Sequence, residues 1–267
     1  MFSKFKISTN SIKSLMLKHG RIRLLDQTNT EAGFYSDILN ICTGDDGIID
    51  GTKMQNLDFP SLLNEYDVFI SYSHNNEDEA LYLASWLQTY CGLNCFLDST
   101  VWHGADDLLL EIDKKYCWQP KSETYNYNKR NFSTSHVHAM LSMAMHDIIN
   151  RSECCIVIDS DQSFPLKEGI DTYTLSPWIY EEVAYITHMM PKLPARYQKN
   201  YTLRLFSNGG QICESRQNIE LKVKYNVDLD KFPTLYSSDL SALYNGGHQA
   251  LDRMYLQKNI LSQLTRI

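Results

Sequence analysis

The chain has 267 residues, 43% of them hydrophobic and 12% aromatic, so it can bury a sizeable core, and only 7 Pro and 12 Gly argue against extensive disorder. The formal net charge of −7 argues against a nucleic-acid backbone as a general partner. No apolar run approaches the roughly 18 residues that a membrane-spanning helix needs, so we expect no membrane segment.

The seven cysteines are spread along the chain. No C-x-x-C pair occurs, so neither a zinc ribbon nor a thioredoxin-like redox motif is supported. Cys95, Cys154 and Cys155 stand in apolar, strand-like runs, where a free cysteine acts as a small hydrophobic residue. This usage, together with an N-terminus that lacks the apolar stretch of a signal peptide, predicts a cytoplasmic protein.

The first 62 residues do not show the strand and helix pattern that begins after them. A short helix with Ile12, Leu15 and Met16 facing inward is expected, capped by Ser11. The stretch Cys42–Lys53 is rich in Asp and Gly and predicts a surface turn, because the spacing of a calcium-binding loop is absent. We therefore expect residues 1–62 to form an N-terminal extension packed on the core.

An α/β core begins at Tyr66. The run 67–72 predicts a buried strand, 77–91 an amphipathic helix, and 94–98 a second buried strand. In open α/β sheets, ligands bind outside the carboxyl ends of the strands. This rule places Ser73, His74, Asp98 and the loop to Trp102 around one crevice.

A long segment, 99–132, follows the second strand and is rich in aromatic residues. We expect its part at about 114–131 to be an insertion. A loop of this length within a compact domain is usually functional or mobile. We expect it to act as a lid or as the contact with a neighbouring subunit. Ser133, Thr134 and Ser135 then supply capping hydroxyls for a helix that runs to about Asn150.

The rest of the chain predicts one strong strand and one well-marked helix. The strand is 154–159, and the helix begins at Pro177 with Ser176 as its cap. Weaker patterns follow: strands at 201–206 and 222–227, and a helix over 238–257 that Gly246 and Gly247 interrupt.

Helical geometry separates the two adjacent carboxylates of the helix from Pro177. At about 100° per residue, Ile179, Val183, Ile186 and Met190 form the stripe that faces the sheet. Glu181 then points away to solvent, whereas Glu182 lies roughly 70° from the centre of the stripe, beside Trp178. Glu182 is therefore the carboxylate expected where the helix meets the strand ends.

Two motifs carry a resemblance to a known family. DVFISYS at 67–73, with CFLDSTVW at 95–102, looks like the start of a Toll/interleukin-1 receptor (TIR) domain, and SPWIYEE at 176–182 is similar to the S-x-W-x-x-x-E motif of that family. The resemblance implies a flavodoxin-like α/β fold with about five parallel strands flanked by helices, spanning residues 63–267.

The resemblance also implies an activity. TIR domains of this type cleave NAD between nicotinamide and ribose, and the glutamate that matches Glu182 is catalytic. By position in the motifs, Ser73, His74 and His103 match substrate contacts, and we add Asp98, Trp102 and Trp178 as candidates at the rim. NAD is then a substrate and no resident cofactor is expected. No metal is expected either, because His136 and His138 point apart on a helix. Phosphate-loop NTPase and dinucleotide-binding Rossmann folds have no support, because neither G-x-x-x-x-G-K-[ST] nor G-x-G-x-x-G occurs.

The chain further resembles the stand-alone TIR proteins of bacterial anti-phage systems such as Thoeris. This likeness implies that the product is a signal of the ADP-ribose type, linear or cyclic, read by a separate effector protein. It also implies assembly into a homo-oligomer through TIR surfaces. The alternative is a non-catalytic TIR scaffold that acts through protein–protein contacts, since fold alone does not establish function.

Overall fold

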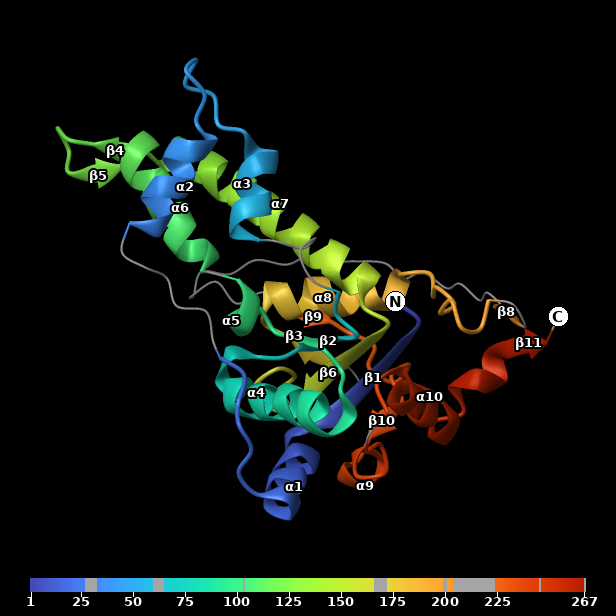
Figure 1. The fold of residues 1–267 in the computed structure, drawn as a ribbon. Helices are drawn as coiled ribbons and strands as arrows, with labels where there is room; N and C mark the ends of the chain where they lie inside the picture. The colour runs from blue at the N-terminus through green and yellow to red at the C-terminus, as the bar shows by residue number, and fades with distance from the viewer. Residues whose placement is uncertain are drawn as a thin grey trace. The chain divides into compact units, whose positions relative to one another are not determined.

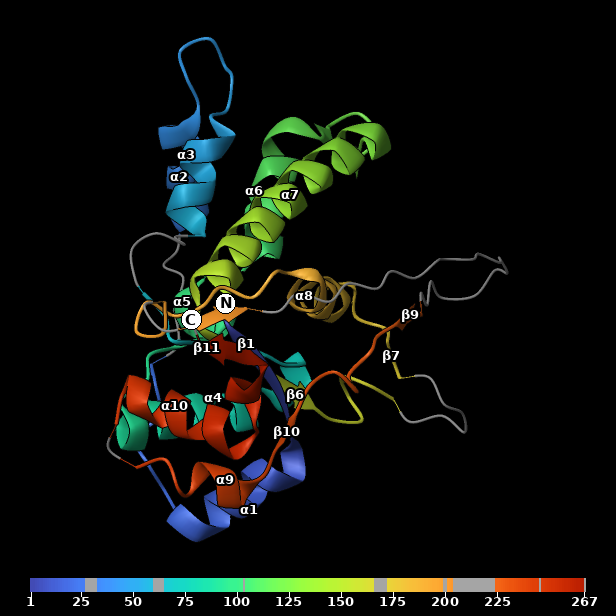
Figure 2. The same cartoon turned by 90° about the vertical axis from the view of Figure 1, so that its right-hand side faces the viewer.

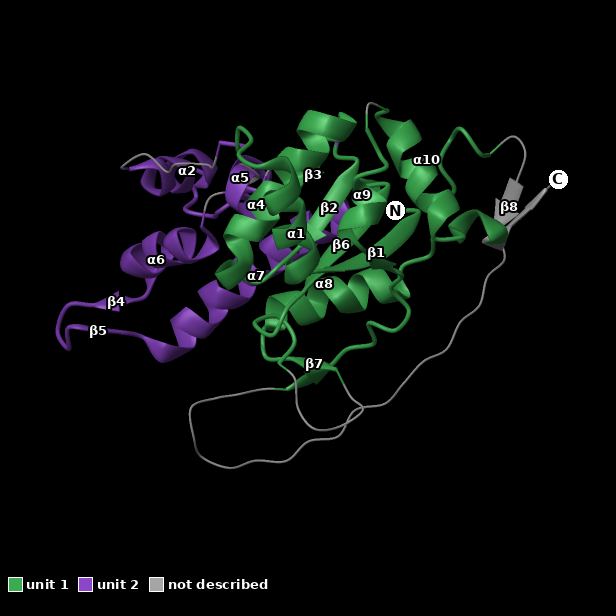
Figure 3. Cartoon of the chain, turned by 90° about the horizontal axis from the view of Figure 1, so that it is seen from below, with its two compact units in different colours: residues 1–24, 66–95, 150–267 green, residues 25–65, 96–149 purple. Residues whose placement is uncertain are grey.

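The structure, a computed structural model, describes residues 1–26, 33–59, 65–102, 104–165, 172–198, 201–203, 224–244 and 246–266. The chain divides into two compact units (Figure 3). The first comprises residues 1–24, 66–95 and 150–267, and the second comprises residues 25–65 and 96–149.

A five-stranded, all-parallel sheet forms the centre of the fold. Its strands lie in the order β10-β1-β6-β2-β3. They are β1 (Ser3–Ser8), β2 (Val68–Ser71), β3 (Cys95–Phe96), β6 (Cys154–Asp159) and β10 (Thr234–Leu235). The expected class is confirmed: the protein is α/β, with a parallel sheet and helices, consistent with a flavodoxin-like fold.

The N-terminal segment is part of this sheet. Strand β1 pairs in parallel with β6 over its whole length, from Ser3 opposite Cys154 to Ser8 opposite Asp159, and its other edge pairs with β10. The prediction of an extension packed outside the core is therefore wrong for residues 1–24. The physical reason is the alternation of β1: Phe5 and Ile7 are fully buried, while Lys4 and Lys6 face the other side and weaken the hydrophobic signal.

The strand order agrees in part with the flavodoxin-like fold that the sequence predicts. Counted from β2, the neighbours β3-β2-β6 have the order 2-1-3 of a flavodoxin-like sheet. The fourth place, beside β6, is then filled by the N-terminal strand β1 instead of a later one. The fifth place is filled by β10, a strand of only two residues that the sequence pattern missed.

Helices of the first unit cover both faces of the sheet. On one side lies α8 (Pro177–His188), and on the other lie α1 (Thr9–His19), α4 (Glu77–Trp86), α9 (Ser237–Leu240) and α10 (His248–Gln257) (Figure 1, Figure 2). Helix α1 begins directly after β1 and is capped by Ser8, whose hydroxyl accepts a hydrogen bond from the Ser11 N–H, so Ser8 and not Ser11 is the cap. Ile12 and Leu15 are buried, as predicted.

Short 3-10, π-helical and strand segments complete the first unit. A 3-10 turn, η1 (His74–Asn76), leads into α4, and a π-helical turn, η2 (Leu87–Cys91), ends it. The pairs β7 (Tyr173–Thr174) with β9 (Tyr225–Asn226), and β8 (Tyr201–Leu203) with β11 (Leu264–Arg266), are antiparallel ribbons. The two late strands that we predicted therefore lie outside the central sheet. The turn η3 (Ile260–Gln263) precedes β11.

The second unit consists mainly of helices. Its elements are α2 (Phe34–Cys42), α3 (Gly51–Asp58), α5 (Asp98–Val101), α6 (Ala105–Tyr116), β4 (Trp118–Gln119), β5 (Thr124–Tyr125) and α7 (Tyr127–Arg151). The insertion predicted at about 114–131 is the end of α6, the β4–β5 hairpin and the start of α7. Ser133 does not cap α7 but lies inside it, where its hydroxyl donates a hydrogen bond of 2.5 Å to Asp113 Oδ1.

Two further findings concern membrane-spanning helices and the state of the cysteines. Within the described residues, no helix is both long and apolar enough to cross a bilayer. The six cysteines in the described part of the chain are free and buried.

Candidate functional site

The carboxyl edge of the sheet contains a topological switch point between β2 and β6. The chain leaves β2 toward β3 on one side, and it leaves β6 toward β10 on the other side. Connections that diverge in this way leave a crevice at the strand ends, which is where open α/β proteins bind their ligands. The site is therefore expected at the loops after Ser71 and Asp159.

A buried polar network joins these two loops. The Ser160 hydroxyl donates to Asn76 Oδ1 at 2.6 Å and lies 3.1 Å from Ser163 Oγ. Ser160 Oγ also accepts the backbone N–H of Ser163 at 3.0 Å. All three side chains are at least nine-tenths buried, so the network fixes the shape of the crevice.

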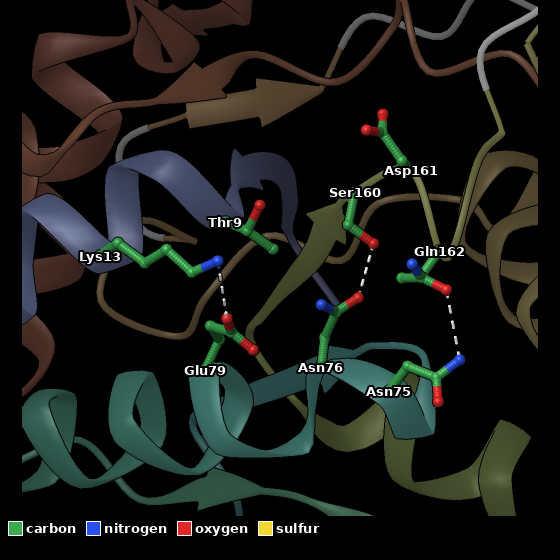
Figure 4. Close-up of a pocket in the computed structure, with 8 residues that line it drawn as sticks. All are labelled: Thr9, Lys13, Asn75, Asn76, Glu79, Ser160, Asp161 and Gln162. Atoms are coloured by element: carbon green, nitrogen blue, oxygen red, sulfur yellow. Dashed lines mark hydrogen bonds and ion pairs between the residues drawn. The ribbon is translucent and has the colours of Figure 1, made fainter.

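An open cavity of about 530 Å³ lies beside this network (Figure 4). It is lined by Thr9, Lys13, Asn75, Asn76, Glu79, Ser160, Asp161 and Gln162. Sequence analysis missed these residues as a set, because Thr9 and Lys13 belong to the N-terminal segment that we had placed outside the sheet. The polar residues that directly follow the predicted strands, Asn75-Asn76 and Ser160-Asp161-Gln162, were the available signal for the rest.

The helix that carries the predicted catalytic glutamate is built as expected at its start. The Ser176 hydroxyl accepts the N–H of Ile179 at 3.3 Å, and Pro177 occupies the first helical position. Ile179, Val183 and Ile186 are buried against the sheet, as predicted. Met190 is not part of this stripe, because α8 ends at His188 and Met190 is exposed.

Glu182 lies on the inward flank of α8. The residue is half-buried, and its Oε2 atom is buried. The carboxylate is near enough to β6 that its charge adds to burial, the larger cause, in raising the pKa of the Cys155 thiol. Glu181 is half-buried as well, so the full exposure predicted for it is wrong.

Three other candidates lie in the first unit. Ser73 precedes the turn η1, and its carbonyl accepts the Asn76 N–H at 2.7 Å. His74 is exposed and packs edge-on against Tyr72, with ring centroids 6.3 Å apart. Trp178 is half-buried in the first turn of α8. All three remain at or near the carboxyl edge of the sheet.

The remaining candidates belong to the second unit. Asp98 opens α5, and its Oδ1 accepts the Ser99 N–H at 2.8 Å, a local role in shaping the loop. Trp102 is only 7% exposed and packs against Phe96 and Phe59, with centroid distances of 4.8 and 5.5 Å. Its ring is a core group, which argues against the predicted role in binding substrate. His103 lies outside the described residues.

Fold and site together define an open α/β protein with a polar crevice at a switch point and a partly buried glutamate on the helix beyond β6. No family model matches the sequence, and no curated protein or solved structure matches it either.

Proposed function

We propose that this protein cleaves NAD at the bond between nicotinamide and ribose, with Glu182 as the catalytic residue. One observation carries the proposal: of two adjacent glutamates on α8, the one that matches the motif is also the one with a buried carboxylate oxygen close to β6. A partly buried carboxylate that lies between a helix and an inner strand costs free energy to desolvate, so stability alone does not explain it. It is the arrangement that a reaction with a cationic transition state uses.

The reaction requires few protein groups besides this carboxylate. Breaking the C1′–N bond leaves its electron pair on nicotinamide and develops positive charge on the ribose, as in glycoside hydrolysis. A carboxylate beside the ribose stabilises that cation. Nicotinamide departs as a neutral molecule, so no general acid is needed. Water then adds to C1′ and loses a proton, or a nucleophile within the ADP-ribose adds and yields a cyclic product.

The two sequence motifs support the same assignment from another direction. The motif at 67–73 ends at the carboxyl end of β2, and the motif at 176–182 contains the cap and first turns of α8. Trp178, four residues before Glu182, offers an aromatic face for a flat ring such as nicotinamide. We further propose that the product is a signal of the ADP-ribose type for a separate effector protein, and that the enzyme acts as a homo-oligomer.

The experiment compares three proteins. Wild type, Glu182→Gln and Glu181→Gln are incubated with NAD, with and without a crowding agent, and released nicotinamide is measured by liquid chromatography. We expect turnover by wild type and by Glu181→Gln, and none by Glu182→Gln. Thermal unfolding of each variant shows whether a loss of activity comes from a loss of fold.

Two results would contradict the proposal. Equal effects of the two substitutions would mean that Glu182 has no special place on α8. If folded wild-type protein releases no nicotinamide under either condition, the non-catalytic TIR scaffold becomes the better explanation.

A further inference from the structure

The cavity of about 530 Å³ lies on the side of the sheet opposite to α8 and Glu182. Lys13 comes from α1 and Glu79 from α4, the two helices that cover this opposite face (Figure 1, Figure 4). Thr9 follows β1, and the remaining lining residues follow β2 and β6. The cavity is therefore a second candidate site at the same edge of the sheet, formed largely by residues that follow three neighbouring strands.

Asn76 is the best evidence that this cavity is a binding site. The residue is 7% exposed, and its Oδ1 accepts the Ser160 hydroxyl. The Ser160 hydroxyl lies 2.6 Å from Asn76 Oδ1 and 3.1 Å from Ser163 Oγ, and the shorter contact fixes the orientation of the Asn76 amide. The Asn76 Nδ2 consequently points into the cavity (Figure 4). No described residue accepts a hydrogen bond from it, so this donor is available to a ligand in the cavity.

The charges of the lining disfavour a phosphate group inside the cavity. Lys13 Nζ lies 3.3 Å from Glu79 Oε1, so its charge is already balanced. Asp161 is exposed and makes no ion pair with the described residues, which leaves the cavity with a net charge of −1 from one lysine and two carboxylates. A phosphate group would meet this negative charge without a free cation.

The composition of the lining also excludes an aromatic ligand. All eight lining residues are polar, and none offers a ring or an aliphatic wall on which a nucleobase would stack. What the cavity offers is a set of oriented donors and acceptors: the Asn76 amide and Lys13 ammonium donate, the Asp161 and Glu79 carboxylates accept, and the Thr9 hydroxyl does both.

We infer that this cavity binds a neutral, polyhydroxylated ligand, a sugar or the ribosyl group of a larger molecule. Vicinal hydroxyls donate to carboxylates and accept from amides, which is the pairing that the lining presents. The site is separate from Glu182, so the inference does not depend on the proposed cleavage of NAD.

Isothermal titration with D-ribose and with ADP-ribose tests this inference, with inorganic phosphate as the anionic probe. We expect saturable binding of D-ribose and none of phosphate. Asn76→Asp replaces the inward donor by an acceptor of the same shape and keeps the oxygen that Ser160 needs, so it should weaken binding at least tenfold. Asn131→Asp, the same chemical change at an exposed position of α7, should leave affinity unchanged.

Asp161→Asn provides a second variant that is safe for the fold, because Asp161 is exposed. It should weaken D-ribose binding severalfold without a change in melting temperature. If ADP-ribose competes with D-ribose in wild type, and Asn76→Asp weakens both, the occupant is a ribosyl group of a nucleotide. If ADP-ribose does not compete, it is a free sugar.

The inference is overturned if D-ribose does not bind, if phosphate binds as tightly, or if neither variant changes the affinity. Glu182→Gln should bind D-ribose like wild type. Loss of NAD cleavage with retained sugar binding would therefore separate the failure of one proposal from that of the other.

Discussion

Arg196 holds Glu153 by two parallel hydrogen bonds, from Nη1 to Oε2 and from Nη2 to Oε1, each 2.6 Å long. Glu153 directly precedes β6 and also accepts the Tyr255 hydroxyl at 2.8 Å. Arg196 Nε donates to Asp252 of α10 at 2.8 Å. One guanidinium thus ties the segment after α8 and the helix α10 to the start of the strand at the switch point.

Removing this guanidinium should destabilise the first unit. Arg196→Ala leaves the carboxylates of Glu153 and Asp252 without their main partner, and Glu153 is only 14% exposed. We expect the free energy of unfolding to fall by about 2 kcal/mol, below the full cost of breaking a buried pair because Arg196 is partly exposed. Urea denaturation measures the change.

Lys114→Ala is the matched control for that experiment. Lys114 forms an equally short ion pair with Glu111, at 2.6 Å, but on the surface of α6. Its removal should not change the denaturation midpoint measurably, because exposed pairs contribute little. A similar midpoint for the two variants would show that the Arg196 cluster does not hold the elements together.

The place of β1 in the sheet makes a second prediction. Ile7 is fully buried on β1, opposite Ile158 of β6. Ile7→Ala should lower the free energy of unfolding by about 3 kcal/mol, the cost of a core cavity. Leu17→Ala removes an aliphatic group of the same size from α1 but at 87% exposure, so it should change stability by less than about 0.5 kcal/mol. An equally small effect of Ile7→Ala would mean that β1 is not part of the core and that the N-terminal segment is an extension.

A buried carboxyl group in the second unit predicts a dependence of stability on pH. Burial, with a smaller effect of the Asp107 carboxylate, raises the pKa of Asp58 from 3.8 to about 7. In the described part of the chain neither carboxylate oxygen of Asp58 has a hydrogen-bond partner. The folded protein therefore keeps this proton up to about pH 7, while the unfolded chain loses it near pH 4.

The sign of the effect follows from this difference. Between about pH 4 and pH 7 the folded state binds more protons, so the stability contributed by protonated Asp58 is lost as the pH rises, at up to about 1.4 kcal/mol per pH unit. Asp58→Asn carries no such proton. Its free energy of unfolding, relative to wild type, should rise from pH 4 to pH 7 and stay level above pH 8. Parallel curves for the two proteins would show that Asp58 is ionised in the folded state.

The sequence by itself determined the elements whose signals are local. The strand β6 was predicted to the residue, because CCIVID is a continuous apolar run that ends on a carboxylate. The Ser-Pro cap predicts helix α8, and the 3.6-residue period of that helix predicts Glu182 on the inward flank. The parallel α/β class followed from the same strand and helix alternation.

Only the tertiary structure decided which segments complete the sheet and where the polar cavity lies. Parallel pairing joins Ser3 to Cys154, which stands 151 positions later in the chain, and no turn residue or local period indicates such a partner. Lys4 makes β1 still harder to predict from the sequence, because a lysine is unusual on an inner strand. Its ammonium is accommodated by the carbonyls of Ile186 and Thr187 at the end of α8, both 3.5 Å away, and by the ring of Phe232. These partners exist only once the chain has folded.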